Sequence, residues 1–262
     1  MKQSDCVIFR DSIAYVGNWI TKQAGVKEES LTDWLLYELS YRIPRVLYKP
    51  FTRHEEGRTT GADWEWWFLI KGDNAYRFRV QAKRSKPNID NYSSIARTNR
   101  YGLQIDKLIT NAKKARAVPI YIFFTDSPNP DNTACRRGVE CNGAFSVGAN
   151  SIYNHFIAPG KNKVDEQSIL KLSIPLECFA CCPISARSGR MESFLHTYFQ
   201  TELSAMSTDG GVDQPWLHRK LPAYVKSILD HPEGIPDWWG REYEIDLIDF
   251  NRLTIFDLRE EQ

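Results

Sequence analysis

Residues 59–84 read TTGADWEWWFLIKGDNAYRFRVQAKR, two apolar segments joined by a short polar turn. Residues 62–70 and 75–84 are rich in aromatic side chains, and the KGDN between them has the composition of a tight turn. The stretch therefore predicts a β-hairpin.

One face of this hairpin is expected to be polar, because side chains alternate across a strand. Asp63 and Glu65 share a face of the first strand, and Gln81 and Lys83 share a face of the second. The polar faces of neighbouring strands can coincide. Two carboxylates, a carboxamide and an ammonium group would then lie together.

The segments around the hairpin predict an α/β fold. Residues 27–43 and 101–116 carry apolar residues at helical spacing. Residues 45–50 read as a short strand, and the wholly apolar VPIYIFF at 118–124 is typical of a strand buried on both faces. The predicted order is helix, three strands, helix, strand.

We divide the 262 residues into an N-terminal segment (1–27), a core (28–125) and a mixed α/β extension packed on the core (126–262). Helices are expected in the extension at 142–157, 190–203 and 216–230. No apolar run approaches the ~20 residues that a membrane helix needs. We therefore expect no membrane partner and a cytoplasmic location.

The residue types on the hairpin suit metal-assisted phosphodiester hydrolysis. Mg²⁺ binds oxygen ligands, usually one or two carboxylates together with waters and phosphate oxygens. A bound cation activates water and neutralises phosphoryl charge, and a nearby lysine stabilises the charge that develops in the transition state.

Asp63 followed by Gln81-Ala82-Lys83 resembles the PD-(D/E)XK nuclease signature in its Gln-x-Lys variant. That variant occurs among Mrr-like restriction endonucleases and defence-associated effectors. The phrases GADWEWWF and FRVQAKR also resemble a bacterial family grouped with these nucleases. The resemblance covers about residues 28–125 and implies a restriction-endonuclease-like core: helix, three-stranded meander, helix, strand.

Carried over to this chain, the resemblance makes Asp63 the main metal ligand and Lys83 the catalytic lysine. Gln81 stands in the place of the usual second carboxylate, which removes one negative charge. Glu65 could compensate, because it shares the face of Asp63. The implied cofactor is Mg²⁺ or Mn²⁺.

Relatives also use a glutamate on the first helix and a polar residue on the second. Glu29, near the start of the first helix, resembles their placement, and Glu38 is the competing candidate. We favour Glu29. On the second helix, Gln104 is the candidate for contacting the substrate backbone.

Basic residues concentrate between Arg77 and Arg116, where eleven Lys and Arg face two Asp. Such a cluster can mark an anionic partner, although a solvated helix face and loop would look the same. In the loop after the hairpin, Lys86, Arg97 and Arg100 are candidate contacts to a DNA backbone.

Six cysteines in a chain of this size do not indicate a disulfide scaffold. A structural zinc is one reading, because CFACC contains a Cys-x-x-Cys step, but we favour buried reduced thiols. The candidate residues are Cys135, Cys141, Cys178, Cys181 and Cys182.

The sequence thus predicts a Mg²⁺- or Mn²⁺-dependent endonuclease that hydrolyses phosphodiester bonds, with DNA favoured over RNA. From the resemblance alone we expect a role in prokaryotic anti-phage defence, a homodimer as one oligomeric option, and an activator as one form of control. The alternative is a catalytically inactive nucleic-acid-binding or protein-interaction module with a nuclease-like core. If the hairpin carries no functional site, its polar face would be in water. Asp63 and Glu65 would then form salt bridges with basic residues of the neighbouring strand.

Overall fold

A computed structural model of the chain describes residues 4–51, 61–85, 95, 98–99, 102–126, 133–135, 143–161, 164–182, 190–207, 214–232 and 251–259. No helix among these residues is long and apolar enough to cross a membrane.

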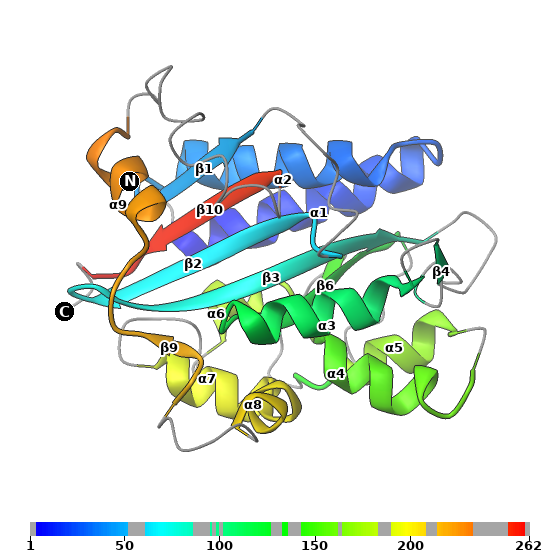
Figure 1. Cartoon of the computed structure of the whole chain (residues 1–262). Coiled ribbons are helices and arrows are strands. Elements are labelled where there is room, and N and C mark those ends of the chain that lie inside the picture. The colour runs from blue at the N-terminus through cyan, green and yellow to red at the C-terminus, as the bar shows by residue number, and fades with distance from the viewer. Residues whose placement is uncertain are drawn as a thin grey trace.

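A mixed β-sheet runs through the centre of the molecule (Figure 1) in the order β1-β10-β2-β3-β6-β7-β8, with β9 paired to β3. Its strands are β1 (Val46–Pro50), β2 (Trp64–Lys71), β3 (Asn74–Arg84), β6 (Val118–Phe124), β7 (Ala144–Gly148), β8 (Ile174–Pro175), β9 (Leu217–His218) and β10 (Arg252–Asp257). The pairs β10–β2 and β3–β6 are parallel, and the other pairs are antiparallel. A separate short ribbon joins β4 (Thr98–Asn99) to β5 (Gly102–Leu103).

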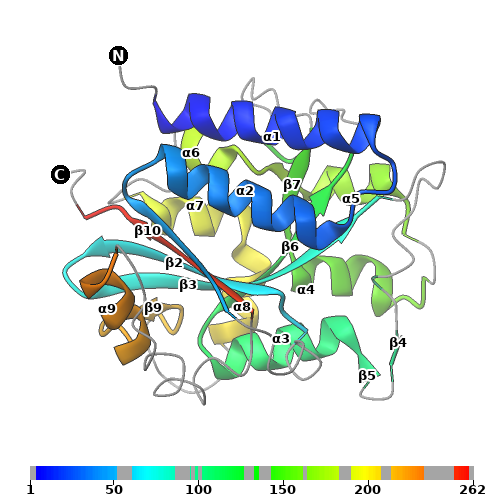
Figure 2. The ribbon, with the colours of Figure 1, turned by 90° about the horizontal axis from the view of Figure 1, so that it is seen from above.

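Helices cover both faces of the sheet (Figure 2). The first face packs against α1 (Asp5–Lys22), α2 (Glu28–Arg42), α6 (Cys178–Cys181), α7 (Met191–Tyr198) and α8 (Gln200–Ser207). The second face packs against α3 (Gln104–Lys114), α4 (Ala149–Ile152) with the π-helical turn η2 (Tyr153–Ile157), α5 (Glu166–Leu172) and α9 (Ala223–Asp230). The α/β class predicted from the sequence is confirmed.

The hairpin forms as predicted, from β2 and β3 in antiparallel register with Trp64 opposite Val80. The predicted alternation also holds. Trp66 and Phe78 lie in the core on the first face, while Trp67 lies in a cluster on the second. The hairpin is buried on both sides, so the reading of a solvated polar face is wrong: Gln81 is only 2% exposed.

The three-stranded meander is wrong in its pairing. β10, from the end of the chain, lies between β1 and β2 and pairs with both, so β1 and β2 are not neighbours. The strand itself has a local signal, since LTIFDL at 253–258 is strand-like, but its pairing has none, because partners some 190 residues away are chosen by tertiary packing. The segment expected as an extension thus contributes a central strand to the sheet of the core.

Two other local expectations change. Residues 142–157 were expected to hold a helix; Ala144–Gly148 instead forms β7, whose residues are all buried beside β6, and a helix begins only at Ala149. An apolar run this short does not distinguish a strand from a buried helix. The segment 1–27 contains the 18-residue helix α1, capped by the Ser4 side chain, which accepts from the Val7 amide at 3.4 Å.

The cysteines differ in part from the expectation. A disulfide joins Cys6 on α1 to Cys181 on α6, with Cα atoms 4.7 Å apart, so reduced thiols are wrong for Cys181. Cys135, Cys178 and Cys182 are buried and form no disulfide within the described residues. Cys141 lies outside the described residues. Disulfides are rare in cytosolic proteins, and the cytoplasmic location stays a prediction.

Gly143 holds α1 close to the sheet. A Cβ atom at this position would lie 2.2 Å from the carbonyl oxygen of Ile13 and 2.6 Å from the amide nitrogen of Gly17. Both are backbone atoms, so no side-chain rotation can relieve the contact. We expect Gly143→Ala to lower the free energy of unfolding by about 3 kcal/mol, the upper part of the range for overpacking.

Urea denaturation followed by circular dichroism measures this effect. Gly25→Ala is the matched control, because a Cβ there has no atom within 4 Å, and it should change stability little. A Gly143→Ala protein as stable as the Gly25→Ala protein would contradict the close packing of α1 on residue 143.

Candidate active site

Asp63 lies immediately before β2, where the hairpin holds it in place. Its backbone amide donates to the Val80 carbonyl at 2.8 Å. One carboxylate oxygen, Oδ2, accepts from the Ala82 backbone amide at 2.9 Å and from Nε2 of Gln81. The structure therefore brings Asp63 and Gln81 together, as the sequence predicts.

Gln104 joins this pair through the first turn of α3, where its Nε2 donates to Oε1 of Gln81 at 2.8 Å. Gly61 permits the approach, since its φ is +72° and a Cβ there would lie 2.5 Å from the Gln104 carbonyl oxygen. Only glycine tolerates both the left-handed backbone and this contact. The chain Asp63–Gln81–Gln104 thus links both hairpin strands to α3.

Lys83 lies two residues beyond Gln81 on the same face of β3 and is only 7% exposed. No ion pair or hydrogen bond is found for its side chain within the described part of the chain. Its charge is nevertheless felt by two acids, because it lowers the pKa of both Asp63 and Glu28. Among the described residues this buried ammonium group has no fixed partner, although it faces two carboxylates. It is therefore available to bind a ligand.

Glu28, the first residue of α2, is the helix carboxylate that faces the site. The guanidinium of Arg84, at the end of β3, donates to the backbone carbonyls of Ala24 and Val26. These bonds fasten the loop before α2 to the hairpin and place Glu28 beside Lys83 and Asp63.

The sequence reasoning missed Glu28. The favoured Glu29 is exposed, although its charge still raises the pKa of Asp63. The competing Glu38 pairs with Arg42 at 3.4 Å, within its own helix. The spacing of apolar residues along α2 was the available signal, and it does not distinguish residues 28 and 29 at a helix end.

The two acids are poised to take up positive charge. Burial is the main cause that raises the pKa of Glu28 to about 7; Lys83 lowers it, while Asp63 and Glu29 raise it. Burial also raises the pKa of Asp63, against the lowering effects of Lys83 and the Ala82 amide. An added cation would stabilise both carboxylates in their charged form.

Tyr121 completes the buried face. It pairs in register with Gln81 on the adjacent strand β6, and it is 0% exposed. Within the described part of the chain its hydroxyl has no hydrogen-bond partner. Burial, followed by the charges of Asp63, Asp106 and Glu28, raises the pKa of this hydroxyl far above its usual range.

Glu65 shares the face of Asp63, but its carboxylate is engaged elsewhere. Oε2 pairs with Arg77 at 2.6 Å and Arg79 at 3.1 Å. Oε1 accepts from Nε1 of Trp67 at 2.6 Å and from the Tyr224 hydroxyl at 2.5 Å.

This cluster is closed to solvent, with Glu65 0% and Arg79 2% exposed. Despite its burial, the two arginines and the tyrosine hydroxyl hold the pKa of Glu65 below its usual value. The cross-strand pairing that sequence alternation allowed is thus present. The geometry assigns Glu65 to a buried ion cluster rather than to the group around Asp63 that was expected to bind metal.

A divalent cation fits the site in a limited way. No set of three or more Asp, Glu, His or Cys side chains in the described ranges is arranged to hold a metal by itself. The hard oxygen donors near Lys83 are the carboxylates of Asp63 and Glu28, with the carboxamide of Gln81 beside them. One or two carboxylates completed by water and phosphate oxygens is the usual protein environment of Mg²⁺, so these residues fit it.

Only part of the basic cluster counted along the sequence is left for a partner. Lys86, Arg97 and Arg100, the predicted DNA contacts, lie outside the described residues. Several others are used inside the fold: Arg77 and Arg79 pair with Glu65, and Arg116 donates to the carbonyls of Pro215 and Leu217 at 2.8 and 3.1 Å. The positive charge available to an anionic partner is therefore smaller than the number of Lys and Arg residues in the sequence suggests.

The raised pKa of Glu28 makes stability depend on pH. Its value of about 7 in the folded protein lies above the ordinary 4.5, so between these values the folded chain retains a proton that the unfolded chain releases. Stability should fall as pH rises through this window and level off above it. We expect Glu28→Gln to match the wild type near pH 4 and to be more stable by about 1–3 kcal/mol at pH 8.

Free energies of unfolding, measured from pH 4 to 8 without divalent metal, test this expectation. Buried Glu202, whose pKa is also about 7, titrates in the same window, so the informative quantity is the difference between wild type and variant. Glu29→Gln, one residue along and exposed, is the control and should keep most of the pH dependence of the wild type. If the free energies of unfolding of wild type and Glu28→Gln changed with pH in parallel, the placement of Glu28 in the buried site would be contradicted.

Fold and site together define a class: an α/β protein whose central hairpin carries a buried lysine between two acids. The chain belongs to the family described as "Family of unknown function (DUF6615)", whose model matches residues 10–262. No curated protein and no solved structure matches the chain.

Proposed function

We propose that this protein is a Mg²⁺- or Mn²⁺-dependent nuclease of the PD-(D/E)XK type that hydrolyses phosphodiester bonds, with DNA as the favoured substrate. The observation that carries the proposal is the group formed by Asp63, Lys83 and Glu28. A buried lysine, for which the described residues offer no ion pair, faces two acids whose pKa values are raised by burial. A purely structural lysine at such depth would be expected to be paired.

The fold supports the proposal through the order of elements around the hairpin. α2, β1, β2, β3, α3 and β6 occur in this order along the chain, with the short β4–β5 ribbon inserted before α3, and β6 lies parallel to β3. This order is the one that the resemblance implies. β10 departs from it, because it separates β1 from β2 without disturbing the hairpin that carries Asp63 and Lys83.

The chemistry assigns a role to each group. A Mg²⁺ or Mn²⁺ held by Asp63 and Glu28 would supply an activated water and neutralise charge on the phosphoryl oxygen. Lys83 then lies where it can orient the attacking water or stabilise the charge that develops on the phosphate. Gln81 fixes Asp63 through its carboxamide, and Gln104 fixes Gln81. Water adds to phosphorus through its oxygen and releases a proton to solvent, the phosphorus–oxygen bond to the leaving group breaks, and the leaving oxygen takes up a proton from solvent.

A cleavage assay tests the proposal. The full chain is incubated with supercoiled plasmid, single-stranded DNA and RNA in Mg²⁺, Mn²⁺ or EDTA, and Mn²⁺ binding is titrated calorimetrically without nucleic acid. We expect cleavage of DNA that needs metal, and Mn²⁺ binding that Asp63→Asn removes.

The calorimetric arm remains informative if cleavage requires an activator. Absence of both cleavage and Asp63-dependent Mn²⁺ binding would overturn the nuclease proposal and favour a binding module with the same core. A role in anti-phage defence and a homodimer belong to the proposal through the resemblance alone.

A further inference from the structure

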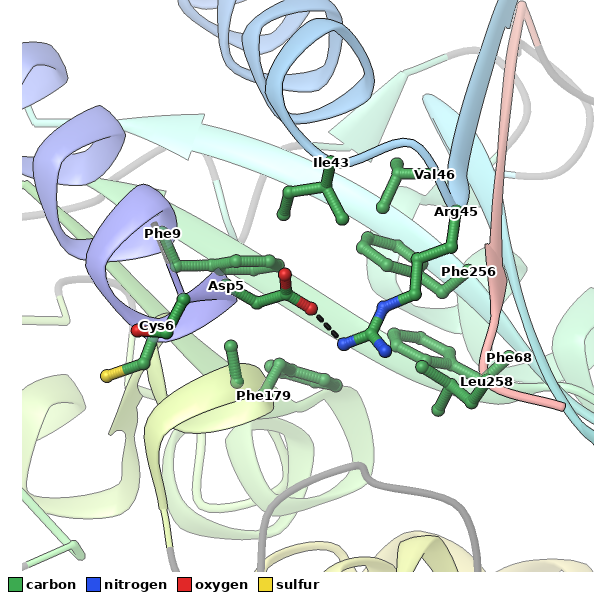
Figure 3. A pocket seen from close by; sticks show the side chains of 12 residues that line it. Asp5, Cys6, Phe9, Ile43, Arg45, Val46, Phe68, Phe179, Phe256 and Leu258 are labelled. Atoms are coloured by element: carbon green, nitrogen blue, oxygen red, sulfur yellow. Dashed lines mark hydrogen bonds and ion pairs between the residues drawn. The ribbon is translucent and has the colours of Figure 1, made fainter. Parts of the chain in front are cut away.

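A pocket lies on the first face of the sheet (Figure 3). Lys83 lies on the other face, because its strand neighbour Ala82 belongs to the core of the first. This pocket has a volume of about 370 Å³ and is lined by residues from α1, α6, β2, β10 and the segment before β1. Phe68 lines it five residues beyond Asp63 along β2, roughly 16 Å away at the rise of a strand. It is therefore separate from the proposed active site.

The walls of the pocket are aromatic and aliphatic. Four phenylalanines surround it: Phe9, Phe68, Phe179 and Phe256. Phe68 and Phe256 are stacked at 4.5 Å between ring centroids, and none of the four phenylalanines is more than 4% exposed. Its volume lies near the lower end of the range for small-molecule pockets.

Its charged groups meet across the opening. Arg45 and Asp5 form an ion pair there, as the dashed line in Figure 3 shows, and their side chains are 31% and 29% exposed. The backbone of Arg45 is fixed, since its carbonyl accepts from the Asp257 amide at 2.8 Å. Asp5 is the first residue of the 18-residue helix α1, whose N-terminus adds a partial charge of about +0.5.

We propose that this pocket binds a small amphiphilic anion: an apolar body of one or two rings that carries a carboxylate, sulfate or phosphate group. The ring system enters among the phenylalanines, and the anionic group shares or replaces Asp5 on Arg45. A planar guanidinium suits such groups because it binds two oxygens at once. The positive helix end favours an anion over a cation. The inference does not depend on nuclease activity.

Two fluorescent probes test the proposal on the full chain. 8-Anilinonaphthalene-1-sulfonate has an apolar body and one anionic group, and N-phenyl-1-naphthylamine is its neutral counterpart. Both are titrated into wild type and variants under conditions where circular dichroism shows the native fold. We expect the wild type to bind both, with the sulfonate bound more tightly.

Charge variants then identify the mouth of the pocket. Asp5→Asn removes the competing carboxylate and should tighten sulfonate binding about fivefold, while Arg45→Gln should weaken it about fivefold, the size of one partly exposed ion pair. Affinity for the neutral probe should stay unchanged in both. Equal effects on the two probes would overturn the role of Arg45.

A filling variant identifies the cavity itself. Ala180 lines the pocket, so Ala180→Phe should lower the affinity for both probes by about tenfold or more. Ala158→Phe is the matched control, because Ala158 is exposed and outside the pocket. Failure of the wild type to bind either probe, or unchanged binding in Ala180→Phe, would overturn the proposal.

Discussion

Replacing Lys83 is expected to abolish most metal-dependent cleavage, with a fall in rate of about 10²–10³-fold. The ammonium group belongs to the end of β3, and its positive charge acts on both Asp63 and Glu28. Lys83→Met is the sharper variant, because it keeps the buried aliphatic stem. Lys83→Ala serves as the second.

The same substitution should also shift the titration of the acids. Since Lys83 lowers the pKa of Glu28 and of Asp63, its removal should raise both, and Mn²⁺ binding should then require a higher pH. Mn²⁺ binding by Lys83→Met should therefore recover as pH is raised, whereas Asp63→Asn should lose both metal binding and cleavage at every pH. Calorimetry measures metal binding and single-turnover kinetics measure cleavage, so the two effects are distinguished.

Lys226→Ala is the control for these variants. Lys226 is 43% exposed and pairs with Asp73 at 2.5 Å on the surface, so its loss should leave cleavage unchanged. Cleavage by Lys83→Met at the rate of the wild type would remove Lys83 from the mechanism.

Glu65→Gln is expected to lower the free energy of unfolding by about 3–5 kcal/mol. The substitution preserves shape but leaves Arg77 and Arg79 without their buried counter-charge. Removing one partner of a buried ion pair costs more stability than the intact pair contributes, because the remaining charge stays buried without a counter-charge. Tyr224 on α9 would also lose its charged acceptor.

This prediction separates two roles for Glu65. If Glu65 holds the hairpin to α9, the variant loses stability, while Mn²⁺ affinity of the remaining folded protein is unchanged. If Glu65 instead binds metal, affinity falls and stability without metal changes little. The matched control is Asp73→Asn, which removes an exposed acid from the turn of the same hairpin and should change stability by less than about 1 kcal/mol.

Glu65 also sets an acid limit on stability. Its pKa is lowered in the folded protein, so its contribution is fully present above the ordinary value of 4.5 and is lost as pH falls through the lower, folded value. The effect is opposite in sign to that of Glu28. Equilibrium unfolding below pH 5 should therefore show a loss in the wild type that is reduced in Glu65→Gln.

Much of the sheet and part of the site could be predicted from the chain alone. The alternation from Asp63 to Trp67 and the two-residue spacing of Gln81 and Lys83 place these side chains on one face wherever the hairpin forms. The hairpin, α2, α3 and β6 were found for the same reason: each is specified by contacts within a few residues. The pairing of Asp63 with Gln81 followed from that local register.

Other features were decided by contacts between distant residues. β10 entered the sheet between β1 and β2, and Tyr224 reached Glu65 from 159 positions away. Glu28 was selected over Glu29 because Arg84 fastens the loop before α2.

The amino-acid pattern by itself determined which side chains share the polar face of the hairpin, because alternation is a property of the strand. Which of them became a buried ion cluster and which were left facing Lys83 depended on what packed over that face. Burial and the neighbouring charges set those roles, and they exist only once the distant segments have met.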